Sequence, residues 1–131
     1  MTKKELSQLY WLNREIEQDK RRLYELECAA TDTSAKISGM PHCSGVSDKV
    51  GKIATEIAYY KSTIEAKNKQ CMAEIIRLSN YISDIDDSLT RQIFTLRYIN
   101  GLNWSRVAFS IGGGNTENGV KQIHCRYLKE H

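Results

Sequence analysis

The chain is predicted to be all-α, with a long antiparallel helical hairpin of the coiled-coil type followed by a head of three short helices. Its 131 residues include a single proline and 27% charged residues, a composition that favours long helices over sheets. Apolar residues recur at steps of three and four through two runs longer than about 25 residues. Three shorter amphipathic runs follow, separated by glycine-containing turns.

The first long helix is predicted from Lys3 to about Ala29, and the second from about Asp48 to about Asp84. Apolar residues at heptad spacing form a seam along each helix, which Asp19 interrupts in the first and Lys67 in the second. Because a two-helix hairpin has little core, residues 1–85 are expected to associate with other copies as a dimer or tetramer. The residues expected to mediate this oligomerisation are Leu9, Leu12, Ile16, Leu23, Leu26, Val50, Ile53, Ile57, Ile64 and Leu78.

The segment 31–47 between these helices is predicted to be a loop because it contains Pro41, two glycines and several serines. His42 and Cys43 are adjacent, but one histidine and one cysteine are only half of a tetrahedral metal site. No metal or other cofactor is therefore expected. The four cysteines are widely spaced, which fits reduced thiols better than a disulfide framework.

Residues 86–131 are predicted to form the three-helix head. Leu89, Ile93 and Leu96 give its first helix an apolar stripe, and Asn100-Gly101 ends that helix. Asn103 is the expected N-cap of a second helix, whose inner residues are predicted to be Trp104, Val107, Ala108 and Ile111. A turn at 112–114 precedes a third helix from Glu117 to Lys129, whose predicted core residues are Val120, Ile123 and Tyr127. The last two helices have helix-turn-helix spacing, which favours double-stranded DNA as the ligand.

The head resembles region four of bacterial sigma factors. The matching residues are Leu96-Arg97-Tyr98, Gly101, the Val107-Ala108 pair and the run Val120 to Ile123. The turn from Ala108 to Val120 is longer than in the sigma pattern by two residues. Gly119 also lies inside the third helix, where glycine costs about 1 kcal/mol relative to alanine.

Nearly the whole chain resembles a family of small phage and prophage proteins from Gram-positive bacteria, which join a coiled-coil half to a sigma-region-four-like helix-turn-helix. The resemblance rests on the Gly-Met-Pro-His-x-Ser-Gly-x-Ser-Asp-Lys-Val-Gly element, matched by Gly39 to Gly51, and on the Gly-Gly-Gly-Asn-Thr turn, matched by Gly112 to Thr116. It implies a phage transcriptional regulator, similar in layout to the activators of phage late genes.

The third helix carries the residues expected to read DNA. Glutamine and asparagine pair with adenine, lysine with guanine, and glutamate with cytosine. The expected base contacts, near the start of this helix, are Glu117, Asn118, Lys121 and Gln122. The expected phosphate contacts are Arg106, Asn115, Thr116, Arg126 and Lys129.

Composition limits the other function classes. Residues 86–131 hold six basic and four acidic side chains, a surplus of +2 that predicts weak DNA binding by a single head. The three histidines have no acidic neighbour at useful helical spacing, so an enzyme is not expected. No membrane span or signal peptide is expected, which places the chain in the cytoplasm of a bacterial host. The alternatives are a small-terminase-like packaging protein and a protein-interaction adaptor; RNA polymerase is a further candidate partner.

Overall fold

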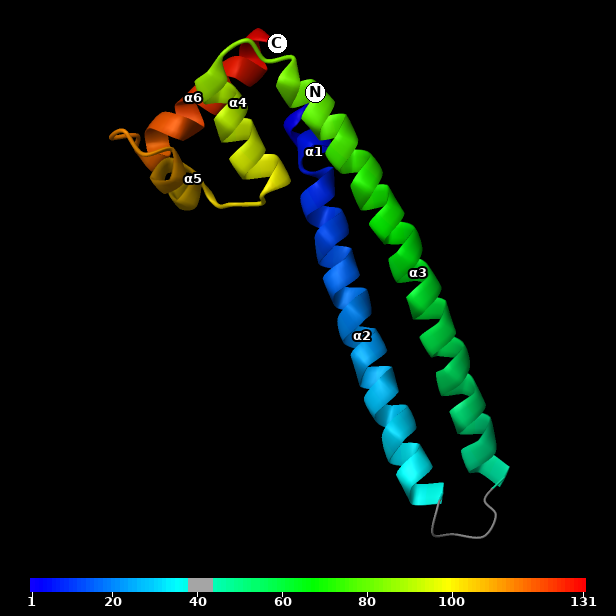
Figure 1. Ribbon diagram of the computed structural model, residues 1–131. Helices are drawn as coiled ribbons and strands as arrows, with labels where there is room; N and C mark the ends of the chain where they lie inside the picture. The colour runs from blue at the N-terminus through cyan, green and yellow to red at the C-terminus, as the bar shows by residue number, and fades with distance from the viewer. Residues whose placement is uncertain (38–43) are drawn as a thin grey trace. The chain divides into compact units, whose positions relative to one another are not determined.

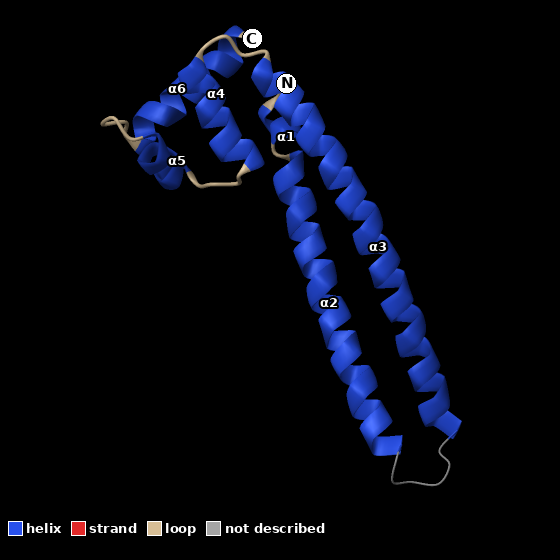
Figure 2. Ribbon diagram, in the orientation of Figure 1, coloured by secondary structure: helices blue, strands red, loops and turns tan. Residues whose placement is uncertain are grey.

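The computed structural model describes the backbone of residues 1–37 and 44–131, and the side chains of residues 1–31 and 49–131. Within these ranges every regular element is helical and there is no strand, which confirms the predicted all-α class (Figure 2). The elements are α1 (Lys3–Leu6), α2 (Gln8–Ile37), α3 (Ser44–Ser83), α4 (Ser88–Phe94), the π-helical η1 (Thr95–Ile99), α5 (Trp104–Ile111) and α6 (Glu117–Glu130) (Figure 1).

The chain divides into two compact units. We call residues 13–69 the hairpin unit, and residues 1–12 together with 70–131 the head unit. The head unit therefore combines residues from both sides of the predicted domain boundary at residue 85. None of the described helices is both long enough and apolar enough to span a membrane.

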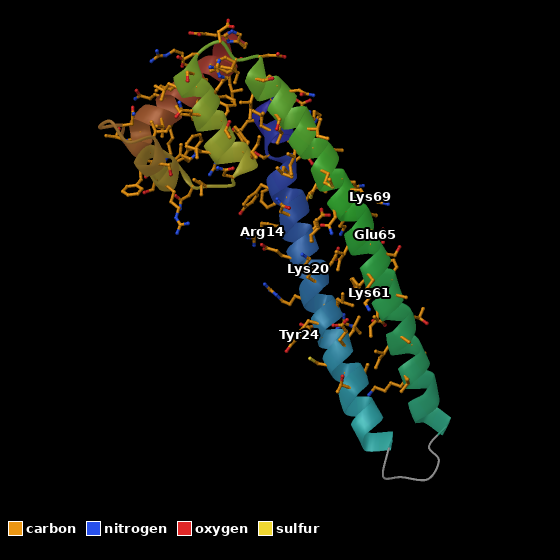
Figure 3. All side chains as sticks on the ribbon, in the orientation of Figure 1. Arg14, Lys20, Tyr24, Lys61, Glu65 and Lys69 are labelled. Atoms are coloured by element: carbon orange, nitrogen blue, oxygen red, sulfur yellow. The ribbon has the colours of Figure 1, made fainter. Side chains whose placement is uncertain are left out.

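In the hairpin unit, α2 and α3 lie side by side and run antiparallel (Figure 1). Ile16 and Leu26 of α2 and Ile53 and Ile64 of α3 are buried. Apolar residues predicted to mediate oligomerisation are thus already buried within one chain. The side chains of Lys20 and Tyr24 extend from α2 away from α3 (Figure 3).

The two polar residues that interrupt the predicted seams bind each other. Lys67 Nζ lies 2.6 Å from Asp19 Oδ2 and 3.5 Å from a carboxylate oxygen of Glu15. The Asp19 and Lys67 side chains are only 16% and 23% exposed, so solvent screens this pair less than the outer ion pairs. The hydrogen bond that Lys67 donates to the Asp19 carboxylate raises the pKa of Lys67. A partly buried polar pair of this kind favours one register of the two helices, because sliding one helix would separate the two charges.

Both long helices extend further than predicted. α2 continues to Ile37 and α3 begins at Ser44, so the predicted loop at 31–47 is wrong at both ends. Residues 31–37 contain neither glycine nor proline, and the one serine and two threonines among them are tolerated in a helix at a small cost. His42, Cys43 and most of the Gly39–Gly51 element lie outside the described residues.

The N-terminal helix is interrupted near its start. Thr2 caps α1 through a capping box with Glu5, and the chain turns at Ser7 before α2 begins. The predicted single helix from Lys3 is therefore divided in two. Leu6 and Leu9 are buried in the head unit, where Leu78 is buried too. Arg77 Nη2 donates to the backbone oxygen of Glu5 at 3.2 Å, which joins α1 to α3.

We expect the Asp19–Lys67 pair to control the stability of the hairpin. Asp19→Leu alone should lower the free energy of unfolding by about 1–2 kcal/mol, because it leaves the Lys67 ammonium with only its longer contact to the exposed Glu15 carboxylate. Adding Lys67→Leu should restore the loss, since the seam is then continuously apolar. Urea denaturation followed by circular dichroism measures both changes. Lys69→Leu is the matched control, because the Lys69 side chain is 77% exposed in a surface pair with Glu65. If Asp19→Leu proves as stable as the control, this role of the pair is wrong.

Candidate nucleic-acid interface

A cluster of aromatic rings holds the inner side of α6 in the head unit. Phe94 is fully buried at its centre, with ring centroids 5.1 Å from His124 and 5.3 Å from Tyr127 of α6. The rings of Tyr98 and Tyr81 lie 5.6 and 6.4 Å from Phe94. Tilted and edge-on ring contacts at these distances contribute stabilising free energy in addition to that from the apolar area they bury. The cluster therefore joins α6 to α4, η1 and the end of α3.

His124 is the one buried polar side chain of α6, and helical periodicity alone did not predict it as a core residue. Its imidazole is 1% exposed, and its Nε2 shares a 2.5 Å hydrogen bond with the Tyr98 hydroxyl. Burial, with Lys3 and Arg97 nearby, lowers the pKa of His124 to about 4. Burial also raises the pKa of Tyr98 to about 12. Both groups are therefore neutral near neutral pH and form an uncharged hydrogen bond in the core.

The π-helical turn η1 positions two further side chains. Its last hydrogen bond, from the Asn100 amide to the Thr95 oxygen, spans five residues instead of four. The guanidinium of Arg97 lies 4.7 Å from the centroid of Trp104 and donates to the backbone oxygen of Leu102 at 2.9 Å. Arg97 thus fixes the start of α5 against η1. The π turn also changes the helical phase, so Tyr98 is buried whereas Leu96 is only half-buried.

The second helix and the turn after it follow the prediction. Asn103 caps α5 by accepting from the Arg106 amide at 2.9 Å, and Val107 and Ala108 are buried. The backbone φ of Gly112, Gly113 and Gly114 is +66°, +64° and +78°, a left-handed conformation that other residues rarely adopt. The three glycines therefore reverse the chain between α5 and α6.

A tight cap begins α6. The Thr116 hydroxyl accepts from the Gly119 amide at 3.1 Å. A Cβ on Gly119 would lie 3.2 Å from that hydroxyl, closer than most real Cβ contacts. Gly119 lowers the helix propensity of α6, but it leaves room for the Thr116 hydroxyl that caps the helix. Asn115, predicted to contact phosphate, instead donates from its side chain to the Gly112 oxygen at 2.8 Å.

The outward face of α6 consists of polar side chains at helical spacing. Asn118, Gln122, Cys125 and Lys129 are exposed and follow one another at steps of four, three and four residues. At 100° per residue they form one stripe opposite Val120 and His124. We call these four residues the α6 stripe. It includes two of the predicted base contacts, Asn118 and Gln122, and one predicted phosphate contact, Lys129.

The other predicted site residues flank the stripe. Glu117 and Lys121 lie on one side, joined by an ion pair of 2.7 Å between Oε1 and Nζ. Arg126 is exposed on the other side and lines a groove with three aspartates. Arg106 is exposed on α5, and the Thr116 hydroxyl is occupied by the helix cap. Lys121 must therefore exchange its partner Glu117 for a base or phosphate if it is to contact DNA.

Three of the six basic residues in 86–131 are exposed, and the other three are half-buried. Arg91 Nη1 donates to the backbone oxygens of Asp86, at 2.9 Å, and of Ile85. Arg97 is bound within the head unit as described above. Of the exposed cations, Arg126 lies in the groove with three aspartates, whereas Arg106 and Lys129 lie outside that groove and form no ion pair with another described residue. The electrostatic attraction of one head for a polyanion is therefore small.

Three features of the head were not predicted. Cys125 lies within the α6 stripe. Its spacing of seven residues from Asn118, about two helical turns, would have predicted that the two share a face. Tyr10 and Trp11 are 45% and 57% exposed. They line a pocket of about 300 Å³ with Arg97, Tyr98 and Asn103. Phe109 on α5 is 89% exposed, and it is not among the residues predicted for the inner face of that helix.

Acid should destabilise the head unit through His124. Because the pKa of His124 falls from about 6.5 in the unfolded chain to about 4 when folded, protonation favours unfolding. The stabilisation is complete above the unfolded pKa and is lost as the pH falls toward the folded one. Between pH 7 and 5 the free energy of unfolding should fall by about 2 kcal/mol.

A Trp11→Phe background leaves Trp104 as the only tryptophan, so its fluorescence can report urea unfolding of the head unit. His124→Gln keeps a polar partner for Tyr98 but does not titrate, and it should remove most of this pH dependence. An equal pH dependence in the two proteins would contradict the assignment.

Comparison with known proteins places no further constraint on the site. No family model, no curated protein and no solved structure matches the chain. A functional conclusion therefore depends on the geometry of the head unit and on the residue pattern of α6.

Proposed function

We propose that the protein is a sequence-specific, double-stranded DNA-binding transcriptional regulator of phage or prophage origin, which acts as an oligomer. The α6 stripe is the observation that supports this proposal most directly. It presents amide and amine groups on a helix whose opposite face is held by a buried aromatic cluster. Amide side chains at this spacing match the donor and acceptor pattern of base edges in a major groove.

The connection between α5 and α6 supports a helix-turn-helix role. Three glycines reverse the chain, the Thr116 cap defines the start of α6, and the first turn of α6 carries Glu117 and Asn118. In helix-turn-helix proteins the start of the second helix contacts base edges while the first helix crosses the DNA backbone. Arg106, exposed on α5, is then suited to a phosphate.

The small positive charge of the head supports an oligomer in this proposal. Affinity for DNA grows with the number of phosphates neutralised, and each head offers few free cations. Two heads on one duplex double that number and read two half-sites. Joining them is the proposed role of the coiled-coil hairpin, with RNA polymerase as the further partner that a regulator recruits.

The exposed phenyl ring of Phe109 favours the adaptor as a second candidate. An apolar ring that is 89% exposed on α5 is a contact suited to a protein partner. An adaptor would use this side of the head and would need no affinity for DNA. Direct measurement of DNA binding separates the two candidates.

Selection from a random duplex DNA library tests the DNA-binding proposal. At near-physiological salt the wild-type protein should enrich a paired motif, and Lys121→Glu should enrich none, because a third carboxylate joins Glu117 and Glu130 on α6. Lys69→Glu is the matched control, since it makes the same charge change on the hairpin unit. If neither the wild-type protein nor the control enriches a motif, the adaptor is favoured.

The oligomeric state can be tested on the outer face of α3. Because the hairpin buries its seam residues in cis, contact with another copy should use exposed apolar residues such as Met72 and Ile76, which are 66% and 61% exposed. The variant with Met72→Ser and Ile76→Ser should sediment as a smaller species than the wild type while its helix content stays the same. Equal sedimentation of both at all concentrations would exclude this face. A large ring-like assembly would instead favour the small-terminase alternative.

A further inference from the structure

The head unit has a second concave surface, which the proposed DNA contact does not use. It is a groove of about 470 Å³ between the segment that joins α3 to α4 and the C-terminal half of α6. The half-buried side chains of Leu89, Ile123 and Tyr127 contribute its apolar part. We call it the acidic groove, and its remaining lining residues are Asp84, Asp86, Asp87, Thr90, Arg126, Glu130 and His131.

The charge of the acidic groove limits what can bind there. Four carboxylates face one guanidinium, a net charge of −3 with His131 neutral. Asp87 is already committed, because its Oδ2 accepts from the Thr90 amide and hydroxyl at 2.9 and 2.6 Å and caps α4. These hydrogen bonds lower the pKa of Asp87, which keeps it ionised. Asp84, Asp86 and Glu130 are exposed and available to a ligand.

Two classes of ligand fit this surface poorly. A nucleic acid would be repelled by the surplus of carboxylates. A tightly bound metal ion would need several ligands that converge, and the described residues contain no group of three or more histidine, cysteine or carboxylate side chains placed to share an ion. A partner that places cations on the acidic side chains and an apolar group among Leu89, Ile123 and Tyr127 satisfies both parts of the surface.

We infer that the acidic groove binds a basic amphipathic segment of a partner protein, with arginine or lysine residues on either side of one bulky apolar residue. The groove is on the α6 flank that carries Ile123, Arg126 and Glu130, whereas the α6 stripe faces elsewhere on the same helix. One head can therefore hold this segment and a duplex together. The inference does not depend on DNA binding.

A display library of short random peptides tests the inference on the full chain. The groove variant Asp84→Asn, Asp86→Asn, Glu130→Gln removes the exposed carboxylates and leaves the Asp87 cap intact. The control variant Glu17→Gln, Glu25→Gln, Glu65→Gln removes the same charge from exposed positions of the hairpin unit. The wild-type and control proteins should enrich peptides with two or more cations around a bulky apolar residue, and the groove variant should not.

A fluorescently labelled peptide from that selection measures how much the groove variant loses in affinity. Fluorescence anisotropy should show binding about tenfold weaker to the groove variant than to the control, because three rim ion pairs are lost. Replacing the apolar residue of the peptide by serine should weaken binding as well. If circular dichroism shows that the groove variant is unfolded, Glu130→Arg replaces it.

Two results would overturn the inference: no peptide that distinguishes the wild type from the groove variant, or equal binding of the serine peptide. Duplex DNA binding is measured on the same proteins. The groove variant should retain it, so failure of the groove and failure of the DNA-binding proposal give different results.

Discussion

The burial of Phe94 against His124 and Tyr127 is the interaction on which the arrangement of the head unit depends. Truncating a buried phenylalanine to alanine costs about 3–5 kcal/mol, a large part of the 5–15 kcal/mol that stabilises a typical domain. The same ring contacts Tyr98 and Tyr81, so one side chain joins α4, η1, α6 and the end of α3. The orientation of α6, and hence of its outward stripe, follows from this packing.

A polar contact in the core makes that packing specific. The hydrogen bond between Tyr98 and His124 requires α6 and η1 to meet in one rotation and one register, because any other would leave two buried polar atoms unpaired. The Asp19–Lys67 pair has the same effect in the hairpin unit. Apolar packing alone would allow several alignments of the helices in each unit. In both units one polar pair favours a single alignment, because the two polar groups meet only there.

The division of charge within the head is consistent with two separate surfaces. Arg91 and Arg97 bind backbone oxygens, and Lys121 binds Glu117, so their charges serve the fold in the free protein. Asp84, Asp86 and Glu130 gather at the acidic groove, while the α6 stripe carries Lys129 and no carboxylate. The head thus presents a cation on one of these surfaces and a cluster of carboxylates on the other.

Local signals in the sequence predicted much of the fold. The Asn103 cap, the turn at Gly112 to Gly114 and the helix from Glu117 depend on neighbouring residues, and all three are confirmed. The apolar period correctly placed Val120 in the core. It also placed Ile123 and Tyr127 there, which the structure leaves half-buried, and it omitted His124, which is buried. A histidine becomes a core residue only when a partner such as Tyr98 is near, and helical periodicity does not encode that partner.

Other features were missed because they arise from contacts between distant residues. The π turn at η1 shifts the phase of its helix by one residue, which no propensity in Thr95 to Ile99 indicates. Asp19 and Lys67 each appeared as a defect in its own seam, although two polar residues on facing helices are a recognisable sign of a pair. Of the candidate site, the sequence predicted which helix carries the polar residues. Which of them are paired depends on the fold, as with Lys121 and Glu117.

The most direct test of the α6 stripe as a DNA-binding surface is the alkylation rate of Cys125 with and without duplex DNA. Cys125 is exposed within the stripe, Cys28 is exposed in the hairpin unit, and Cys71 is buried, so one chain contains both the probe and its internal reference. In a Cys43→Ser background, mass spectrometry of iodoacetamide-treated protein gives the rate at each thiol. If the α6 stripe binds DNA, random-sequence duplex at low salt should slow alkylation of Cys125 severalfold and leave that of Cys28 unchanged. Unchanged alkylation of Cys125 under conditions where the duplex is bound would contradict it.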